Sequence, residues 1–413
     1  MRLRLFLPRR GGGAGQRRLK RGGALLAAVA LVAGCGGNAQ QRTVSTPSVA
    51  APELKPPPAF AIGVTESNPH LLAPGPQPDP FALWRDRLAT LRPQYIRVLV
   101  DWSQVQPRAD QPPDWRRPQD GCMRAQPPCA PWNGLLDTLR AVEQLGAQPV
   151  LVLYGTPAWA ARPPTGCERP GTTPYARMPR IADYSAFVRS LLELGRDEGI
   201  ELAWWSAWNE PNLPAFLNPQ RQACEPHSPT LAATAYAQLV AALRSELSDA
   251  GGEHHVLVGE TAGIPDPHPH ATGAAEFNRA LPDRVVCQAD GWAQHAHLVR
   301  PRGAGRQLEG VSPGETHQLI DGLERAIAQH GCARPPKLWI TETGVGGAPD
   351  GCALMATELR TWQDDPHVAA AFQYTFREDP AFPVGLADLG LTTLYPAYEA
   401  WRTRGDTDCA SAH

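Results

Sequence analysis

Two glutamates stand where apolar runs of the chain end. Glu210 closes a run that begins at Leu202 and contains three tryptophans, and Pro211 follows at once. Glu342 closes a second apolar run that begins at Lys337. Such runs predict strands buried on both faces, and the proline ends the first because it has no N–H for the ladder. Both carboxylates are therefore predicted at the carboxyl ends of buried strands, where α/β folds bind ligands.

A pair of carboxylates suits the cleavage of an acetal. One carboxyl group protonates the leaving oxygen, and the second meets the oxocarbenium centre. Glu210 and Glu342 are 132 residues apart in the sequence, so only a fold that gathers strand ends can join them. A closed barrel does this, because the carboxyl ends of all its strands face one mouth.

One pattern repeats along the chain: a short apolar run, a polar loop, and a segment with helical periodicity. These elements would position the two glutamates. Strands are predicted at 60–64, 95–100, 149–154, 202–209, 256–258, 291–297, 337–344 and 369–376. Helices are predicted at 81–91, 132–145, 181–198, 231–247, 274–281, 316–329, 352–362 and 397–404. This alternation predicts the α/β class and a single-domain (β/α)8 TIM barrel. No Gly-x-Gly-x-x-Gly opens the first crossover, which argues against a doubly wound open sheet.

The residues around the two glutamates resemble those of clan A glycoside hydrolases. Residues 208–211, Trp-Asn-Glu-Pro, resemble the acid/base motif of that clan. Residues 339–344, Trp-Ile-Thr-Glu-Thr-Gly, are similar to its nucleophile strand. The stretches 155–159, 385–386 and 395–398 are similar to relatives of glycoside hydrolase family 39. The resemblance covers about residues 60 to 405.

The resemblance implies a role for each residue. Glu210 would be the general acid/base and Glu342 the nucleophile. Arg97 would lie beneath Glu342 and keep it ionised, although it could equally neutralise any buried acid. Asn209 would bind the hydroxyl on sugar carbon two. The carboxyl groups should then be roughly 5–5.5 Å apart and the enzyme retaining, whereas a separation beyond roughly 6.5 Å would contradict this.

One stretch departs from the clan pattern. The clan commonly carries His-x-Tyr on its sixth strand, and this chain has His295 and His297 there. An imidazole can donate the hydrogen bond that the tyrosine hydroxyl would make to the nucleophile. Because imidazole titrates near neutrality, we expect that support to depend on pH.

Other residues near strand ends are further candidates for the site. Tyr154 is a candidate substrate contact, and Glu260 is the best rival nucleophile, although it lacks the long apolar run that precedes Glu342. Trp102, Trp159 and Trp205 could stack on sugar rings or belong to the core.

The paired carboxylates favour a glycosidase that hydrolyses O-glycosyl bonds, and the resemblance implies a β-linked poly- or oligosaccharide as the substrate, such as an exopolysaccharide. The alternative is a catalytically silent glycan-binding lipoprotein on the same fold. We expect no cofactor, no catalytic metal and a monomer. Residues 1–34 hold eight basic and no acidic residues, so removing them changes the net charge from −2 to −10. No basic stripe then remains, and nucleic-acid binding is disfavoured.

The start of the chain has the features of an export signal. Basic residues lead into the apolar run 24–33, which is too short to span a bilayer. The sequence up to Cys35 resembles the lipobox of bacterial lipoproteins, which implies a signal peptide over 1–34 and a lipid on Cys35. The polar, proline-rich residues 35–58 would tether the barrel, residues 59–405, to a bacterial membrane on its periplasmic or outer side. Residues 406–413 are predicted to be a C-terminal tail.

Eight cysteines remain after Cys35, an even number that suggests disulfides in an exported protein. No pair has the Cys-x-x-Cys spacing of a zinc or redox site. Eight cysteines allow 105 sets of pairs, and their positions between the predicted elements favour some of these pairs: Cys122 with Cys129, Cys167 with Cys224, Cys287 with Cys332, and Cys352 with Cys409.

Overall fold

The computed structural model describes residues 60–66, 68–74, 81–117, 134–168, 172–264, 270–301, 308–311, 313–379 and 382–411. The predicted signal peptide, Cys35, the tether, and the cysteines Cys122 and Cys129 lie outside these residues.

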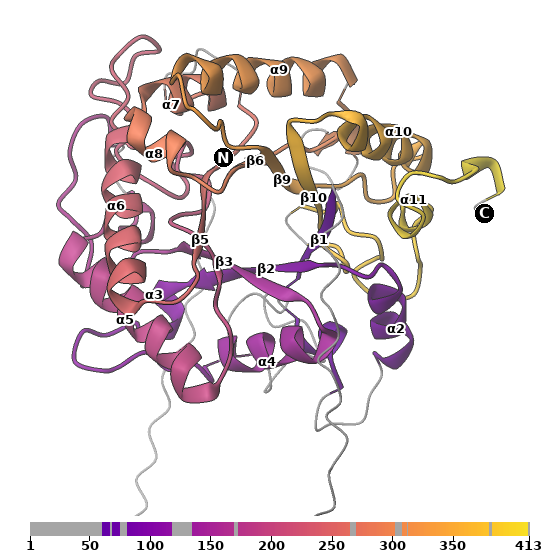
Figure 1. The fold of residues 1–413 in the computed structure, drawn as a ribbon, viewed down its shortest axis with the longest axis horizontal. Coiled ribbons are helices and arrows are strands. Elements are labelled where there is room, and N and C mark those ends of the chain that lie inside the picture. Colours follow the sequence, from indigo (N-terminus) through magenta and orange to yellow (C-terminus); the bar gives the residue numbers. More distant parts are fainter. Residues whose placement is uncertain are drawn as a thin grey trace, which may run out of the picture. The chain divides into compact units, whose positions relative to one another are not determined.

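Eight parallel strands close into a barrel, in the order β1-β10-β9-β6-β5-β4-β3-β2 (Figure 1). This confirms the predicted (β/α)8 fold. The strands are β1 (Ala61–Thr65), β2 (Tyr95–Asp101), β3 (Gln148–Tyr154), β4 (Trp204–Ser206), β5 (His255–Thr261), β6 (Gly291–His295), β9 (Leu338–Thr343) and β10 (Val368–Tyr374).

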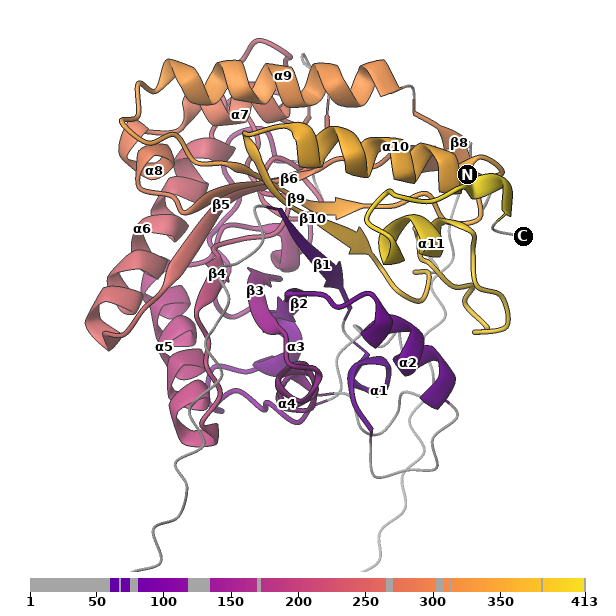
Figure 2. The same ribbon diagram turned by 45° about the vertical axis from the view of Figure 1, so that its right-hand side comes forward.

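Helices surround the barrel and connect successive strands (Figure 2). The larger ones are α2 (Ala82–Thr90), α4 (Leu135–Leu145), α5 (Ile181–Glu198), α6 (Ala232–Ala250), α7 (Ala274–Ala280), α8 (Asp283–Cys287), α9 (Pro313–Gln329), α10 (Gly351–Asp364) and α11 (Ala397–Arg402). Short elements lie in the loops: α1 (Pro69–Leu72), α3 (Trp102–Val105), η1 (Pro174–Ala176), η2 (Cys409–Ser411) and the hairpin of β7 (Val299–Pro301) and β8 (Leu308–Gly310). Within the described ranges, each helix is too short or too polar to cross a membrane.

Two predicted elements differ from the structure, and one element was not predicted. The strand predicted at 202–209 is a strand only over Trp204–Ser206, because the chain turns out of the sheet before Glu210. The helix predicted at 274–281 is followed by a second helix, α8, and Pro282 separates the two. The β7–β8 hairpin was not predicted, since its strands are only three residues long.

Aromatic side chains fill the barrel below the layer that carries the site. Trp204 and Trp339 lie 4.7 Å apart between ring centroids, and Tyr95 lies 5.0 Å from Trp339. Alternate residues of a strand face the same side. Arg97 is two residues after Tyr95 on β2, and Thr341 is two residues after Trp339 on β9. Both side chains therefore also point into the barrel, one layer closer to its mouth.

Three of the predicted disulfides are present. Cys167–Cys224 joins the loops after β3 and β4, and Cys287–Cys332 joins α8 to the segment before β9. Cys352–Cys409 joins α10 to η2, so the residues predicted as a tail are attached to the barrel.

Candidate active site

Glu210 lies just beyond β4, where the backbone changes direction. Its φ is 38° and that of Glu260, at the end of β5, is 51°. A residue other than glycine rarely adopts such a value, and the strain costs on the order of 1–3 kcal/mol. Backbone hydrogen bonds hold both turns in place: Asn209 N–H donates to the Leu153 carbonyl at 2.9 Å, and Glu210 N–H to the Glu260 carbonyl at 3.0 Å.

The loop after Glu210 is fixed by one buried amide. Asn212 is 0% exposed, and its Nδ2 donates to the carbonyls of Ala262 at 3.0 Å and Thr272 at 2.9 Å. Its Oδ1 accepts from the Ala262 N–H at 2.9 Å. Because every polar atom of this side chain is used, the turn that carries Glu210 is bound to the loop after β5.

Arg97 on β2 lies at the centre of the site and is 0% exposed. Its Nη1 donates to Glu342 Oε1 at 2.6 Å. Its Nη2 donates to Asn209 Oδ1 at 2.6 Å and to Glu260 Oε2 at 2.8 Å. One planar guanidinium thus positions three side chains from three other strand ends. Since it is fully buried and does not line the cavity described below, Arg97 acts on these side chains and does not reach that space itself.

Glu260 is not available as a nucleophile. Its side chain is 0% exposed, and its Oε2 contacts Arg97, His295 and the Thr341 hydroxyl, the last two at 3.0 and 3.1 Å. Burial would raise the pKa of Glu260, but the charges of Arg97 and His295 outweigh it and lower the pKa. The rival role predicted for this residue is therefore wrong, and its carboxylate instead bridges Arg97 and His295.

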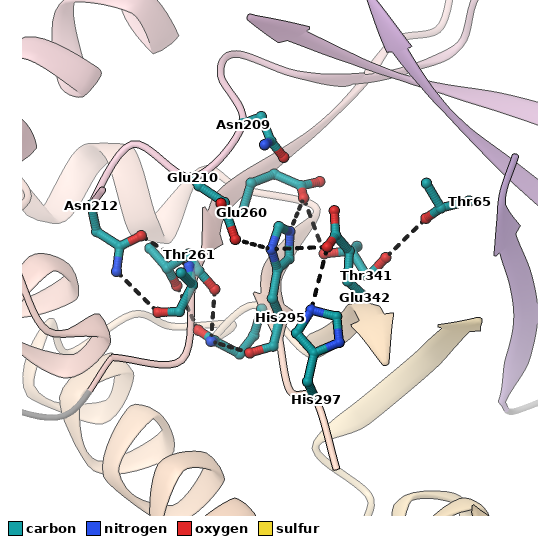
Figure 3. Close-up of polar contacts among 12 residues, drawn as sticks. Thr65, Asn209, Glu210, Asn212, Glu260, Thr261, His295, His297, Thr341 and Glu342 are labelled. Carbon is teal, nitrogen blue, oxygen red and sulfur yellow. Dashed lines mark hydrogen bonds and ion pairs between the residues drawn. The ribbon is translucent and has the colours of Figure 1, made fainter. Parts of the chain in front are cut away.

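His295 at the end of β6 is surrounded by carboxylates (Figure 3). Its Nδ1 lies 2.9 Å from Glu210 Oε1 and 3.5 Å from Glu342 Oε2, and its Nε2 lies 3.0 Å from Glu260 Oε2. Burial alone would lower the pKa of His295, but Glu342, Glu210 and Glu260 raise it to about 9. The ring is thus an imidazolium at neutral pH, with both nitrogens donating.

Three groups of described side chains are close enough to hold a metal ion. Glu210, His295 and Glu342 form one of them. These three side chains are joined by the contacts of His295 Nδ1 with both carboxylates. Cys167 and Cys224 belong to the second, and their sulfurs are joined to each other. The third lies at the surface around Glu324.

Glu342 is the next-to-last residue of β9, and its surroundings favour the ionised carboxylate. Burial would raise its pKa, but His295 and Arg97 lower it to about 2. His297 adds to this effect, with its Nε2 at 3.5 Å from Glu342 Oε2. A carboxylate held in this way is ionised and oriented, as a nucleophile must be.

Glu210 and Glu342 lie together at the mouth of the barrel. One oxygen of each is within 4.8 Å of the other. Both line a cavity of about 510 Å³, together with Asn209 and Tyr154. The structure thus brings together four of the residues that the sequence singles out.

The three tryptophans that were expected either to stack on sugars or to belong to the core do not line this cavity. Trp102 is 0% exposed and stacks on Phe187 at 4.9 Å, and Trp205 is also fully buried. Trp159 packs edge-on against Trp102 at 5.6 Å and donates to the Gln106 carbonyl. Among the described residues, none of the three tryptophans lines the cavity, so the core role left open for Trp102 and Trp205 is the one observed.

Other residues that line the cavity were not predicted as substrate contacts. They are Leu99, Asp101, Gln104, Tyr175, Ala215, Phe216, Tyr374 and Asp379. Burial raises the pKa of Asp101 to about 6, although bonds from Ser103 and Gln104 oppose the shift. Asp101 ends β2, and this position at a strand end is what marks it in the sequence as a residue near the site, although no role in binding was predicted for it. The residues in loops, such as Phe216, carry no comparable signal.

A second cavity, of about 580 Å³, lies beside the histidines. His295 and His297 line it, together with Leu319 of α9 and Phe382. The two histidines thus line this cavity and also contact the carboxylates that line the first one.

No protein-family model matches the chain, and no curated protein matches its sequence. Solved structures of glycoside hydrolases do match the fold. A glucosidase from Croceicoccus marinus has a TM-score of 0.54 at 14% identity, over 84% of this chain and 68% of that one. A family 39 glycoside hydrolase from Bacteroides cellulosilyticus WH2 has a TM-score of 0.51 at 15% identity, over 84% of this chain and 63% of that one.

An endo-beta-1,4-glucanase from Xanthomonas axonopodis pv. citri has a TM-score of 0.51 at 14% identity, over 84% of this chain and 99% of that one. The chain thus spans nearly all of this enzyme but less than two thirds of the Bacteroides protein. At these identities the likeness shows a shared barrel fold.

Proposed function

We propose that the protein is a retaining glycoside hydrolase that cleaves O-glycosidic bonds of a β-linked poly- or oligosaccharide. The observation that supports this most strongly is the pair of oxygens, one from Glu210 and one from Glu342, within 4.8 Å of each other beside one cavity. Retaining enzymes hold their carboxyl groups roughly 5–5.5 Å apart, whereas inverting enzymes leave room for a water between them.

In the first step, Glu342 attacks the anomeric carbon while Glu210 protonates the departing glycosidic oxygen. Arg97 and the histidines keep Glu342 ionised, so its oxygen is ready to form the bond. The His295 imidazolium donates to Glu210 Oε1, so the acid proton belongs on Oε2. The glycosidic bond breaks, and the product of this step is a glycosyl ester of Glu342 and a free leaving group.

In the second step, the Glu210 carboxylate takes a proton from water, and the resulting nucleophile attacks the same anomeric carbon. The ester bond to Glu342 breaks, Glu210 is protonated again, and the configuration of the sugar is retained. Asn209 assists both steps. Its Oδ1 is held by Arg97, so its Nδ2 is the group that remains to donate to the sugar.

The cavity supports a carbohydrate substrate. Its volume of about 510 Å³ is large enough for more than one sugar ring, and Tyr154, Tyr175 and Phe216 line it. Aromatic faces and a few fixed polar groups are the usual lining of sites for small organic ligands.

We also propose that the enzyme is exported and held at a bacterial membrane by a lipid on Cys35. The basic and apolar residues before Cys35 support this. Incorporation of a labelled fatty acid by the wild-type protein, and its loss in Cys35→Ser, is the expected result. Labelling that persists in the variant would contradict it.

Hydrolysis of a glycan panel tests the activity. The wild-type enzyme should release reducing sugar from at least one β-linked glycan, and Glu342→Gln should release none. A matched control is Glu253→Gln, because the Glu253 side chain is 83% exposed and should leave the rate unchanged. Binding without cleavage by the wild type would instead indicate a glycan-binding protein.

A further inference from the structure

The turn at Glu210 has a backbone conformation that is unfavourable in itself. The φ of Glu210 is 38°, in the left-handed region, and Pro211 follows it. A residue other than glycine keeps such a conformation only where the surrounding structure holds it with more than one contact. The contacts that hold this turn therefore also determine where the Glu210 carboxyl group lies.

A closed ring of buried hydrogen bonds lies directly after this turn. Gln220 Nε2 donates to the Pro211 carbonyl at 2.9 Å, and Gln220 Oε1 accepts from the Thr272 hydroxyl at 3.1 Å. The Thr272 N–H donates to the Asn212 carbonyl at 3.0 Å, and Asn212 Nδ2 donates to the Thr272 carbonyl at 2.9 Å. Because Asn212 follows Pro211 in the sequence, the chain itself closes the ring.

Water cannot replace the hydrogen bonds of this ring. Gln220 is 1% exposed, and Asn212 and Thr272 are 0% exposed. Gln220 Nε2 uses its second hydrogen on the Leu217 carbonyl at 2.7 Å. Loss of one member would leave a buried donor or acceptor without a partner, which costs more than the bond itself contributes. The ring therefore holds its members in one arrangement.

The ring joins the loops that follow two neighbouring strands. Gln220 lies in the loop after β4, and Thr272 lies in the loop after β5. Arg221 continues this junction, because its buried Nε donates to the Ala271 carbonyl at 3.1 Å and its Nη2 to Glu276 of α7 at 2.6 Å. Two consecutive residues thus attach the loop that presents Glu210 to the loop beside it.

We propose that Gln220 and Thr272 are positioning residues whose hydrogen bond holds the turn at Glu210, so that its carboxyl group reaches the departing glycosidic oxygen. This rests on the proposed role of Glu210 as the acid. Neither residue is among the described residues that line the cavity beside Glu210, so both act through the backbone of the turn.

Replacement of Thr272 tests this hydrogen bond. Thr272→Val removes the hydroxyl and keeps the shape of the side chain, whereas Thr272→Ser keeps the hydroxyl. On a glycan, whose leaving oxygen needs a proton, we expect the Val variant to lower kcat/KM about 10- to 10²-fold, because the acid is misplaced. The Ser variant should stay within about threefold of the wild type. Gln220→Met should lower kcat/KM at least as much as Thr272→Val, since the Pro211 carbonyl also loses its donor.

A dinitrophenyl glycoside shows whether the loss acts through Glu210. This leaving group departs without protonation, and kcat/KM follows formation of the intermediate with both substrates. We expect Thr272→Val and Gln220→Met to keep kcat/KM for this glycoside within about threefold of the wild type. A smaller fraction of folded enzyme would lower kcat/KM equally for both substrates, so the ratio of the two values separates positioning from a role in stability alone.

The control removes a buried hydroxyl from another part of the barrel. Thr138 of α4 is 3% exposed, and its hydroxyl donates to the Gly134 carbonyl at 3.2 Å. Thr138→Val makes the same chemical change as Thr272→Val. It should keep the wild-type kcat/KM for the glycan and the wild-type ratio between the two substrates.

Three results would overturn the positioning role while the wild type cleaves glycan: wild-type kcat/KM for the glycan in Thr272→Val, equal losses in the Val and Ser variants, or equal losses with both substrates. Should Gln220→Met fail to fold, the two Thr272 variants decide the question. A wild-type protein that cleaves no glycan would instead contradict the proposed function, and this role with it.

Discussion

Arg97 is the residue on which the rest of the site depends. It is fully buried and holds Glu342, Glu260 and Asn209 with its two terminal nitrogens. Removing either partner of a buried ion pair costs several kcal/mol in stability, because the remaining charge is then buried without a partner. Replacement of Arg97 should therefore lower the stability of the fold as well as the proposed activity.

Replacement of Arg97 by Met should lower the free energy of unfolding by about 3–5 kcal/mol, because it leaves the buried carboxylates of Glu260 and Glu342 without their cation. Urea denaturation of the purified variant measures this. Arg189→Met is the control: that arginine side chain is 56% exposed beside Glu246, and its loss should cost at most about 1 kcal/mol. Similar losses in the two variants would contradict the central position of Arg97.

Replacement of Glu210 by Gln should slow hydrolysis of glycosides with poor leaving groups by about 10²–10⁴-fold, because the departing oxygen no longer receives a proton. Formation of the intermediate from a dinitrophenyl glycoside should be close to the wild-type rate, since that group departs without protonation. Rapid-mixing kinetics of the two substrates check this. An equal loss of rate with both substrates would contradict the role of Glu210 as the acid.

The element that presents Glu210 is the loop between β4 and α6. Cys167–Cys224 joins it to the loop after β3, and Asn212 joins it to the loop after β5. The predicted strand 202–209 located the glutamate correctly but overestimated the strand, because apolar Ala207 and Trp208 are buried outside the sheet. An apolar run indicates burial and does not distinguish a strand from a packed turn.

Removal of the Cys167–Cys224 bond by double replacement with Ser should lower stability by roughly 4 kcal/mol, since it frees a closed segment in the unfolded chain. The proposed activity should fall as well, because the β3 loop no longer supports the β4 loop. Thermal unfolding and kcat measure the two effects. Loss of Cys287–Cys332, on the segment before β9, is the matched control and should lower stability but spare kcat. Equal activity in both double variants would contradict the role of the loop.

At the scale of the whole molecule, the sequence could predict those parts of the site that the strands of the barrel position. Alternation of strands and helices determines that the strand ends meet, so Glu210 and Glu342 could be assigned to one site. Arg97 lies within β2, and only the resemblance to clan A glycoside hydrolases assigned it to that site. The cavity walls come from loops with no periodic pattern, so Tyr175 and Phe216 were not predicted. The number of tryptophans could not show which of them lie in the core and which contact a ligand, because both environments favour large aromatic side chains.

The buried charges also make the stability of the whole fold depend on pH. The pKa of His295 is raised from 6.5 to about 9, so its contribution is complete below 6.5 and is lost as the pH rises through 9. The pKa of Glu342 is lowered from 4.5 to about 2, so its contribution is complete above 4.5 and is lost as the pH falls through 2.

Together these shifts predict greatest stability between pH 4.5 and 6.5. From pH 6.5 to above 9 the free energy of unfolding should fall on the order of 3 kcal/mol through His295. Urea titrations across this range check it, and His295→Gln should show a flatter profile than the wild type. An equal alkaline loss in the variant would assign the dependence to other groups.

Trapping the covalent intermediate tests the central claim most directly. A glycosyl donor fluorinated at carbon two, with a good leaving group, slows the second step, so the sugar accumulates on the nucleophile. Mass spectrometry of the digested protein should find the sugar on the peptide that carries Glu342, with none bound to Glu342→Gln. A label on Glu260, or hydrolysis of glycan with no labelled residue, would contradict the double-displacement mechanism through Glu342.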